Sequence, residues 1–192
     1  SFGDGDGQQS APLVASDIVA HEYAHAITER TAGLVYESDS GALNEAMSDI
    51  MASVCEAWKD GVISLQTWQV GEDIFTPASP DDAMRYMYSP NLDGSSADCW
   101  YSGVGSIDVH YSSGIANHFF YLLAEGTDPA GLPHSPTCVP GNTKKATGAG
   151  LLAGIGRGKA DKIWYRALTL YMTSSTNYAG ARQATVRAAG DL

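Results

Sequence analysis

The chain has 192 residues, enough for one hydrophobic core, so a single domain is the default expectation. Its formal net charge of -11 argues against binding to nucleic acid or to an anionic membrane, because both favour basic surfaces. A hydrophobic content of 44% and a charged content of 17% exclude a disordered chain, and no apolar run approaches the roughly 18 residues of a membrane-spanning helix.

Apolar periodicity and turn residues predict a mainly α-helical chain with long irregular loops. Apolar residues recur at helical spacing in several segments, and the segments between them are rich in Gly, Pro and Ser. In chain order we first expect a Gly-rich loop over 1–16, a helix over 17–31, an extended stretch over 34–36 and a helix that ends near residue 60. An irregular region over 61–110 follows, with turns at Pro77, Pro80, Pro90 and Gly94. We then expect a helix capped by Ser112 or Ser113 and stopped by Gly126, a loop over 126–156, and helices over 159–172 and 178–189.

The first expected helix contains the stretch His21-Glu22-Tyr23-Ala24-His25. Residues four apart lie on one helix face, so both imidazoles can reach a single metal ion. Glu22 lies beside that face and can accept a proton from a water that the metal activates. A structural zinc site is usually closed by four protein ligands, whereas a catalytic site keeps one position open. The histidine pair therefore needs one more protein ligand.

The second expected helix offers Glu45 as that ligand. Glu45 and Asp49 lie four residues apart, on a face flanked by Ala42 and Ala46. Buried carboxylates without a partner are costly, so this face calls for a metal or a basic group. In a generic helix a solvated polar face is the better interpretation. The histidine pair that lacks one ligand reverses that preference here.

With these motifs the chain resembles the thermolysin-like family of zinc metallopeptidases. The matching segments are Phe2–Gly7, Asp17–His25, Thr31–Tyr36, Gly41–Glu45, Gly71–Asp73, Met84–Met87, Asp108–Gly114 and Lys162–Leu168. The resemblance implies that residues 17–192 form the helical C-terminal lobe and that 1–16 are an interlobe segment. It also implies that both ends are cut short and that an N-terminal β-rich lobe precedes this chain, so any activity belongs to the parent protein.

The resemblance assigns the central chemistry to a few residues. It implies that His21, His25 and Glu45 bind one catalytic zinc ion, and that Glu22 is the general base. Imidazoles that bind a metal usually donate their second N–H to a carboxylate or carbonyl. Asp49 matches the family residue that accepts this hydrogen bond from the first histidine.

Further residues match groups that support the reaction. Asn44 could support His25 in the same way as Asp49 supports the first histidine. His110 and Tyr36 match the family's donors to the negative charge that develops on the substrate oxygen. Without the resemblance, His110 reads as a polar loop residue and Tyr36 as a strand aromatic. Asp108 could orient the imidazole of His110 and favour its protonated form.

Substrate specificity is expected from an apolar pocket for the side chain that follows the scissile bond. Arg85 matches an arginine that contacts the substrate carbonyl, and a surface salt bridge is its alternative role. Core packing explains each matching pocket residue equally well. The residues that match the pocket wall are Leu13, Ile18, Val70, Ile74 and Met84. The expected cleavage lies before Leu, Phe, Ile or Val.

Calcium is the second expected cofactor, because hard oxygen ligands are what this ion requires. The residues that match family calcium ligands are Asp17, Glu56 and Glu72. Asp17 could instead be the N-cap of the first helix. Thr67 stands where a two-ion site would have another acid, so one ion is expected. A weaker second site could involve Thr76 and Asp82.

The remaining cysteines and histidines carry weaker signals. Cys99 and Cys138 lie in loops and could form a disulfide, which would indicate an oxidising compartment. Cys55 lies within the second helix and is expected to pack as a small buried hydrophobe. His118 is expected on a helix surface, and His134 has no assigned role.

The sequence thus predicts a secreted, extracellular zinc endopeptidase. Its expected partners are peptide or protein substrates and its own propeptide, with no nucleic acid or membrane partner, and a monomer is expected. A catalytically silent metal-binding module is the alternative, but metal binding alone needs none of Glu22, His110 and Tyr36. A zinc hydrolase such as an aminopeptidase would need a group that captures a free N-terminus, and the sequence shows no such group.

Overall fold

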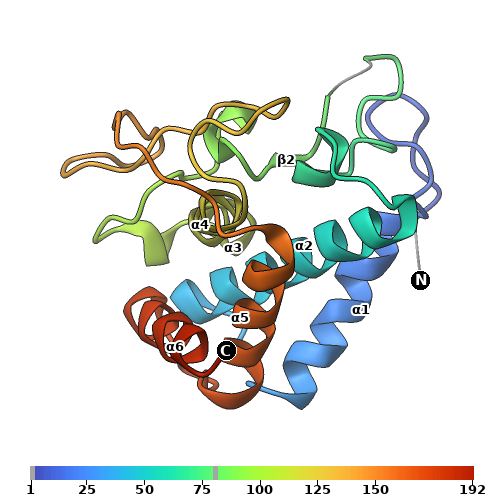
Figure 1. Ribbon diagram of the computed structural model, residues 1–192. Helices are drawn as coiled ribbons and strands as arrows, with labels where there is room; N and C mark the ends of the chain where they lie inside the picture. The colour runs from blue at the N-terminus through green and yellow to red at the C-terminus, as the bar shows by residue number, and fades with distance from the viewer. Residues whose placement is uncertain (1–2, 80–81) are drawn as a thin grey trace.

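The computed structural model describes residues 3–79 and 82–192, and it is mainly helical, as the sequence predicts (Figure 1). The helices are α1 (Ser16–Arg30), α2 (Ser38–Asp60), α3 (Val109–Ser112), α4 (Gly114–Ala124), α5 (Arg157–Leu170) and α6 (Tyr178–Gly190), with 3-10 helices η1 (Gln66–Trp68), η2 (Pro90–Asp93) and η3 (Val104–Ser106) and strands β1 (Gln69–Val70) and β2 (Arg85–Tyr86). Phe2 of the first motif, the start of the 1–16 segment and the turn at Pro80 lie outside the described residues. No helix in the described ranges is long and apolar enough to cross a membrane.

Helix α2 is the centre of the molecule, and α1 packs along it (Figure 1). Over Ser40–Ile50 every residue of α2 is buried, which is more than an amphipathic pattern alone would predict. The helix ends at Gly61, whose φ of 69° is left-handed and therefore suits glycine. Because the Ser40–Ile50 part of α2 is enclosed on all sides, its polar residues must find partners inside the protein.

The hydrophobic core lies against the apolar residues of α2. Leu43, Met47 and Ile50 are each 1% exposed, and burying one such side chain contributes about 1.5–3 kcal/mol. The same cluster includes Leu34, Trp68, Met87, Ala116, Phe120, Tyr121, Ala124, Ile163, Trp164 and Leu168. This packing holds α2 in place, and with it the side chains of α2 that face α1.

The two strands form one antiparallel pair, in which Val70 lies opposite Arg85. The pair packs beside α2 and brings β2 close to the polar face of that helix. No strand forms over 34–36; instead the N–H of Val35 donates to the carbonyl of Ser174 at 2.9 Å. The predicted extended stretch is therefore held by the segment between α5 and α6.

The start of α3 and α4 differs from the prediction of a serine cap. Asp108 caps α3, since its carboxylate accepts a hydrogen bond from the N–H of His110 at 2.9 Å. Ser113 makes no side-chain cap, and its hydroxyl donates to the carbonyl of His110 at 2.8 Å. Gly126 follows the end of α4 with a φ of +87°.

The long loop after α4 is joined to the segment before α3 by the disulfide Cys99–Cys138, with a Cα–Cα distance of 5.8 Å. This confirms the expected pairing. The prediction for Cys55 is wrong, because its side of α2 is open to solvent and the thiol is exposed. His134 is also exposed, and its Nδ1 lies 3.9 Å from Asp128.

The prediction for His118 is also wrong, because the loop covers its face of α4. His118 is 2% exposed, and its Nδ1 lies 3.0 Å from the carbonyl of Asp98. Its Nε2 lies 2.9 Å from the hydroxyl of Ser135. Burial lowers the pKa of His118, so the neutral ring is the form that fits here.

Candidate metal centre

Three side chains from α1 and α2 converge on one point, which we call the metal centre: His21, His25 and Glu45. One ligand atom from each lies within 4.8 Å of the others. The two histidine Nε2 atoms are 3.2 Å apart. Oxygens of Glu45 lie 3.4 Å from Nε2 of His21 and 3.5 Å from Nε2 of His25. The i and i+4 spacing of the two histidines in α1 thus places both imidazoles on one helix face, as predicted.

The hydrogen bonds of the two imidazoles fix which ring nitrogen carries a proton. Nδ1 of His21 lies 2.8 Å from Oδ1 of Asp49, which can only accept, so that nitrogen is the donor. Nδ1 of His25 lies 2.8 Å from Oδ1 of Asn44, whose amide nitrogen donates to the carbonyl of Leu34 at 3.0 Å. Because this second bond orients the amide, Nδ1 of His25 is also a donor. In the neutral, metal-binding form of each ring, Nε2 therefore carries the lone pair.

Two lone pairs and a carboxylate that face one another repel unless a cation lies between them. Oε2 of Glu45 is buried and has no hydrogen-bond partner among the described residues, as expected of an oxygen aimed at an ion. Burial opposes charge on His21, but the carboxylates of Asp49 and Glu45 outweigh it and raise the pKa of His21 to about 9. The centre therefore stabilises positive charge, and its two nitrogens and one carboxylate fit zinc.

Asp49 is fully buried and connects the metal centre to β2 and α4. Besides His21, it accepts two hydrogen bonds from Arg85, at 2.7 and 2.8 Å, and one from the amide of Asn117 at 2.8 Å. Burial would raise the pKa of Asp49, but the guanidinium of Arg85 and the hydrogen bond from His21 hold it well below its usual range. The Asp49 carboxylate is therefore ionised and fully paired.

Arg85 forms a buried bidentate pair with Asp49, with its side chain 13% exposed, so the alternative of a surface salt bridge is wrong. Sequence reasoning missed Asn117, although a polar amide within the apolar run of α4 was a usable signal. Such a residue needs a partner once its helix is buried.

Tyr36 and His110 lie side by side at the edge of the metal centre. The hydroxyl of Tyr36 is 3.3 Å from Nε2 of His110, and it donates to Oε1 of Glu45. Burial and the neighbouring Glu45 raise the pKa of Tyr36, so the phenol keeps its proton. Nδ1 of His110 lies 2.7 Å from Oδ1 of Asp108, as expected for an orienting carboxylate.

Glu22 lies on α1 between the two histidines and is exposed. In the described part of the chain, its side chain makes no hydrogen bond or ion pair. Its carboxylate is therefore accessible to a water or substrate that approaches the metal centre from solvent.

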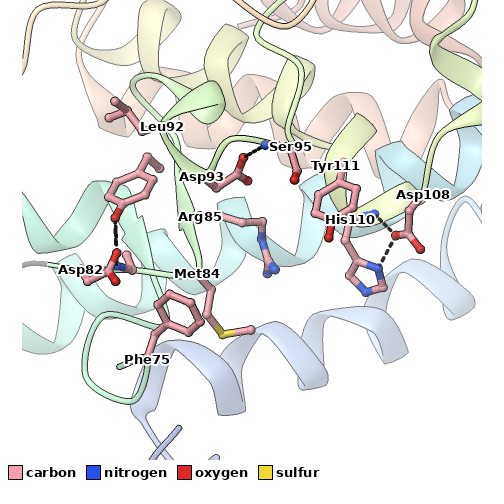
Figure 2. Close-up of a pocket in the computed structure, with 12 residues that line it drawn as sticks. Phe75, Asp82, Met84, Arg85, Leu92, Asp93, Ser95, Asp108, His110 and Tyr111 are labelled. Atoms are coloured by element: carbon pink, nitrogen blue, oxygen red, sulfur yellow. Dashed lines mark hydrogen bonds and ion pairs between the residues drawn. The ribbon is translucent and has the colours of Figure 1, made fainter. Parts of the chain in front are cut away.

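A pocket of about 570 Å³ opens beside His110. Figure 2 shows Arg85 within this pocket, with His110 and Asp108 on one side and Asp82 on the other. Met84 and Arg85, two of the residues predicted to bind substrate, line it.

The other four residues predicted for the pocket wall do not line this cavity. Ile18, Val70 and Ile74 form a small buried cluster, against which Leu13 packs. The structure therefore agrees with the core-packing interpretation for these four residues.

Asp17 near the start of α1, Glu56 near the end of α2 and Glu72 just after β1 form a second group, which we call the acidic cluster. Asp17 is not the N-cap of α1, because its carboxylate instead accepts from the N–H of Gly71 at 2.6 Å. Burial raises the pKa of both Glu56 and Glu72, and the negative charge of Asp17 adds to the effect. Oε2 of each glutamate is buried without a hydrogen-bond partner among the described residues.

The acidic cluster is less compact than the metal centre. Among the described residues, only His21, His25 and Glu45 form a group whose ligand atoms all lie within 4.8 Å. At the weaker calcium site expected from the sequence, the hydroxyl of Thr76 donates to Oδ2 of Asp82 at 2.8 Å.

Two family models, for two domains of the same protein family, together match almost the whole chain. Residues 32–192 match the thermolysin metallopeptidase alpha-helical domain, and residues 1–29 match the thermolysin metallopeptidase catalytic domain. The chain is 46% identical over 193 residues to a transglutaminase-activating metalloprotease of Streptomyces mobaraensis. It is 40% identical over 195 residues to a thermolysin of Alicyclobacillus acidocaldarius.

Both alignments cover 100% of this chain but only 24% and 32% of the relatives, so the chain spans about a quarter to a third of their length. Among solved structures, it is similar to a precursor of protealysin, a metalloproteinase from Serratia proteamaculans. That comparison has a TM-score of 0.70 and 27% identity, and it covers 99% of this chain and 56% of the other. The chain therefore belongs to the thermolysin family of metallopeptidases.

Proposed function

We propose that the protein containing this chain is a zinc-dependent endopeptidase. The observation that carries the proposal is the pair of imidazole lone pairs that face each other beside the Glu45 carboxylate. Asp49 and Asn44 hold the two rings in this orientation. Relatives whose names describe metalloproteases and thermolysins support the same function.

His21, His25 and Glu45 would hold the zinc ion through two nitrogens and one carboxylate. When bound, zinc supplies a Lewis acid and makes a water molecule a good nucleophile at neutral pH. Glu22 is accessible from solvent, and we assign it as the base that accepts the proton of the attacking water. The same carboxylate then delivers a proton to the leaving amine.

Tyr36 and His110 supply hydrogen bonds to the substrate oxygen as it becomes negative. Their donor atoms are 3.3 Å apart, so both can reach one oxygen atom. Asp108 accepts from Nδ1 of His110, which orients the ring and leaves Nε2 toward the substrate. A hydrogen bond donated by Nε2 requires the imidazolium form of His110, in which both ring nitrogens carry a proton.

We propose cleavage on the amino side of Leu, Phe, Ile or Val. Met84, Phe75 and Leu92 give the pocket beside His110 apolar surface, and this supports the preference. Sequencing the products of a digested protein tests it, and cuts confined to positions before charged residues would exclude it.

The remaining expectations are part of the same proposal. The acidic cluster would bind one structural calcium ion, since Oε2 of Glu56 and of Glu72 has no hydrogen-bond partner among the described residues. We propose that residues 17–192 act as the helical lobe, with 1–16 leading to an N-terminal lobe of a secreted, monomeric enzyme. The Cys99–Cys138 disulfide supports secretion, and the similarity to a precursor supports the propeptide as a partner.

A catalytically silent metal-binding module is the competing function, and Glu22 separates the two. The experiment uses the full-length protein loaded with one zinc ion per chain and an internally quenched peptide with Leu after the scissile bond. Glu22→Gln should keep the zinc and lower kcat by about 10²–10⁴-fold. Equal turnover by the variant and the unsubstituted protein would remove Glu22 from the mechanism, and no turnover by either would favour the silent module.

A further inference from the structure

Gly41 lies one helical turn before Glu45 and is buried. It lies within α2, and its φ is not among the positive values that favour glycine. Alanine is the better helix former at such a position, because glycine loses more backbone entropy on folding. Backbone conformation therefore does not explain a glycine here, and the space around its Cα must.

Two segments leave no room for a side chain at Gly41. A Cβ atom built there would lie 2.7 Å from Cγ1 of Val109 and 2.9 Å from the carbonyl carbon of Tyr36. Carbon atoms normally pack about 3.5–4.0 Å apart, so both contacts are too short. The Tyr36 atom is backbone and cannot rotate away. Val109 is the residue immediately before His110, so one methyl group would press on both segments.

The short helix α3 cannot easily retreat from α2 to relieve that pressure. At its start, Asp108 accepts hydrogen bonds from the N–H and Nδ1 of His110, at 2.9 and 2.7 Å. At its end, the hydroxyl of Tyr178 in α6 donates to the carbonyl of Ser112 at 2.5 Å. A displacement of α3 would break contacts at both ends, so the pressure would move His110, Tyr36 or both.

We propose that Gly41 is a positioning residue, whose missing side chain sets the distance between Tyr36 and His110. The inference rests on the proposed peptidase function, in which these two residues act on one substrate oxygen. Their donor atoms are 3.3 Å apart, and a misplacement of about 1 Å can lower a rate by about 100-fold. Gly41 itself does not touch the substrate; it acts through the two segments that it allows to meet.

Gly41→Ala in the full-length, zinc-loaded protein tests the proposal. We expect kcat to fall by about 10- to 100-fold with little change in KM, because the lost interaction forms in the transition state. Zinc should remain at one ion per chain, and Tm should fall. Gly158→Ala is the matched control, because Gly158 lies in the first turn of α5 and a Cβ there meets no heavy atom within 4 Å. It should keep kcat and leave Tm unchanged or higher.

Val109→Ala, added to Gly41→Ala, removes the nearest clashing atom and should recover part of both kcat and Tm. An unchanged kcat in Gly41→Ala, or a double variant no better than the single one, would overturn the proposal. If Gly41→Ala does not accumulate as folded protein, recovery of folded, zinc-binding double variant supports the contact and no recovery rejects it.

Failure of the peptidase function is distinguishable from failure of this inference. An unsubstituted protein that binds one zinc ion but cleaves no peptide would refute the function. An active unsubstituted protein with an equally active Gly41→Ala variant would refute the positioning role alone. The Tm values of the three variants test the packing contact without any catalytic readout.

Discussion

The metal centre and the acidic cluster both bury carboxylates against α2, but they balance the resulting charge differently. At the metal centre, Asp49 is paired with Arg85, His21 and Asn117, and Oε2 of Glu45 has no hydrogen-bond partner among the described residues. In the acidic cluster, one oxygen of Glu56 and one of Glu72 have no hydrogen-bond partner among the described residues, and burial beside two other carboxyl groups raises the pKa of Glu72. The chain itself orients the first site, whereas the second is proposed to rely on a bound calcium ion.

The largest effect of a substitution is expected at the metal centre. His25→Ala leaves one imidazole and one carboxylate, too few for a zinc site with three protein ligands. We expect zinc content and peptide hydrolysis to fall to background. Glu72→Gln, which changes the other site, should keep both. Metal analysis beside a peptidase assay checks this, and full zinc occupancy in His25→Ala would exclude it as a ligand.

The next effect concerns the carboxylate that links the centre to β2. Asp49→Asn leaves Arg85 buried without its anionic partner, and we expect a loss of about 3–5 kcal/mol in the free energy of unfolding. Zinc affinity should fall about 10- to 100-fold, because the residue also orients His21. Denaturant unfolding and zinc titration measure the two effects.

Asp60→Asn is the control, since Asp60 forms an exposed pair with Lys59. It should change the free energy of unfolding by no more than about 0.5 kcal/mol. If Asp49→Asn and Asp60→Asn lowered the free energy of unfolding equally, the Asp49–Arg85 pair would contribute no more to stability than an exposed ion pair.

Calcium binding at the acidic cluster should change stability less than Asp49→Asn does, and in the opposite direction. At about 100 times its Kd, an ion that binds only the folded state raises the free energy of unfolding by about 2.7 kcal/mol. We expect such a gain in the unsubstituted protein and a much smaller one in Glu72→Gln. Thermal melts with and without calcium measure it, and an equal gain in both proteins would place calcium elsewhere.

The acidic cluster also predicts a dependence of stability on pH. Burial, with the charges of Glu56 and Asp17, raises the pKa of Glu72 from the ordinary 4.5 to about 9. The folded protein therefore keeps a proton that the unfolded chain releases, so this stability is fully present below about pH 4.5 and is lost as the pH rises toward 9. Zinc-loaded protein freed of calcium should lose Tm over this window. The Tm of Glu72→Gln should fall less over the same pH range. Parallel curves of Tm against pH for the two proteins would contradict the prediction.

Local spacing made the metal centre predictable. His21 and His25 are four residues apart, as are Glu45 and Asp49, and helical geometry alone brings each pair to one face. The missing third ligand of the histidine pair then linked α1 to Glu45 of α2, and the family resemblance added Tyr36 and His110. These residues meet in the structure because the two helices pack along each other.

Burial that depends on distant segments could not be predicted in the same way. His118 is covered by a loop that begins after α4, and Cys55 is exposed because its side of α2 has no such cover. The pair of Arg85 with Asp49 joins residues 36 apart through strand β2. Periodicity in one helix carries no information about what packs over it, so these contacts needed the fold.

The most direct test of the metal centre is X-ray absorption spectroscopy at the zinc edge on the full-length, zinc-loaded protein. We predict two imidazole ligands with only oxygen donors besides. A zinc ion with sulfur ligands, or with fewer than two imidazoles, would contradict the account.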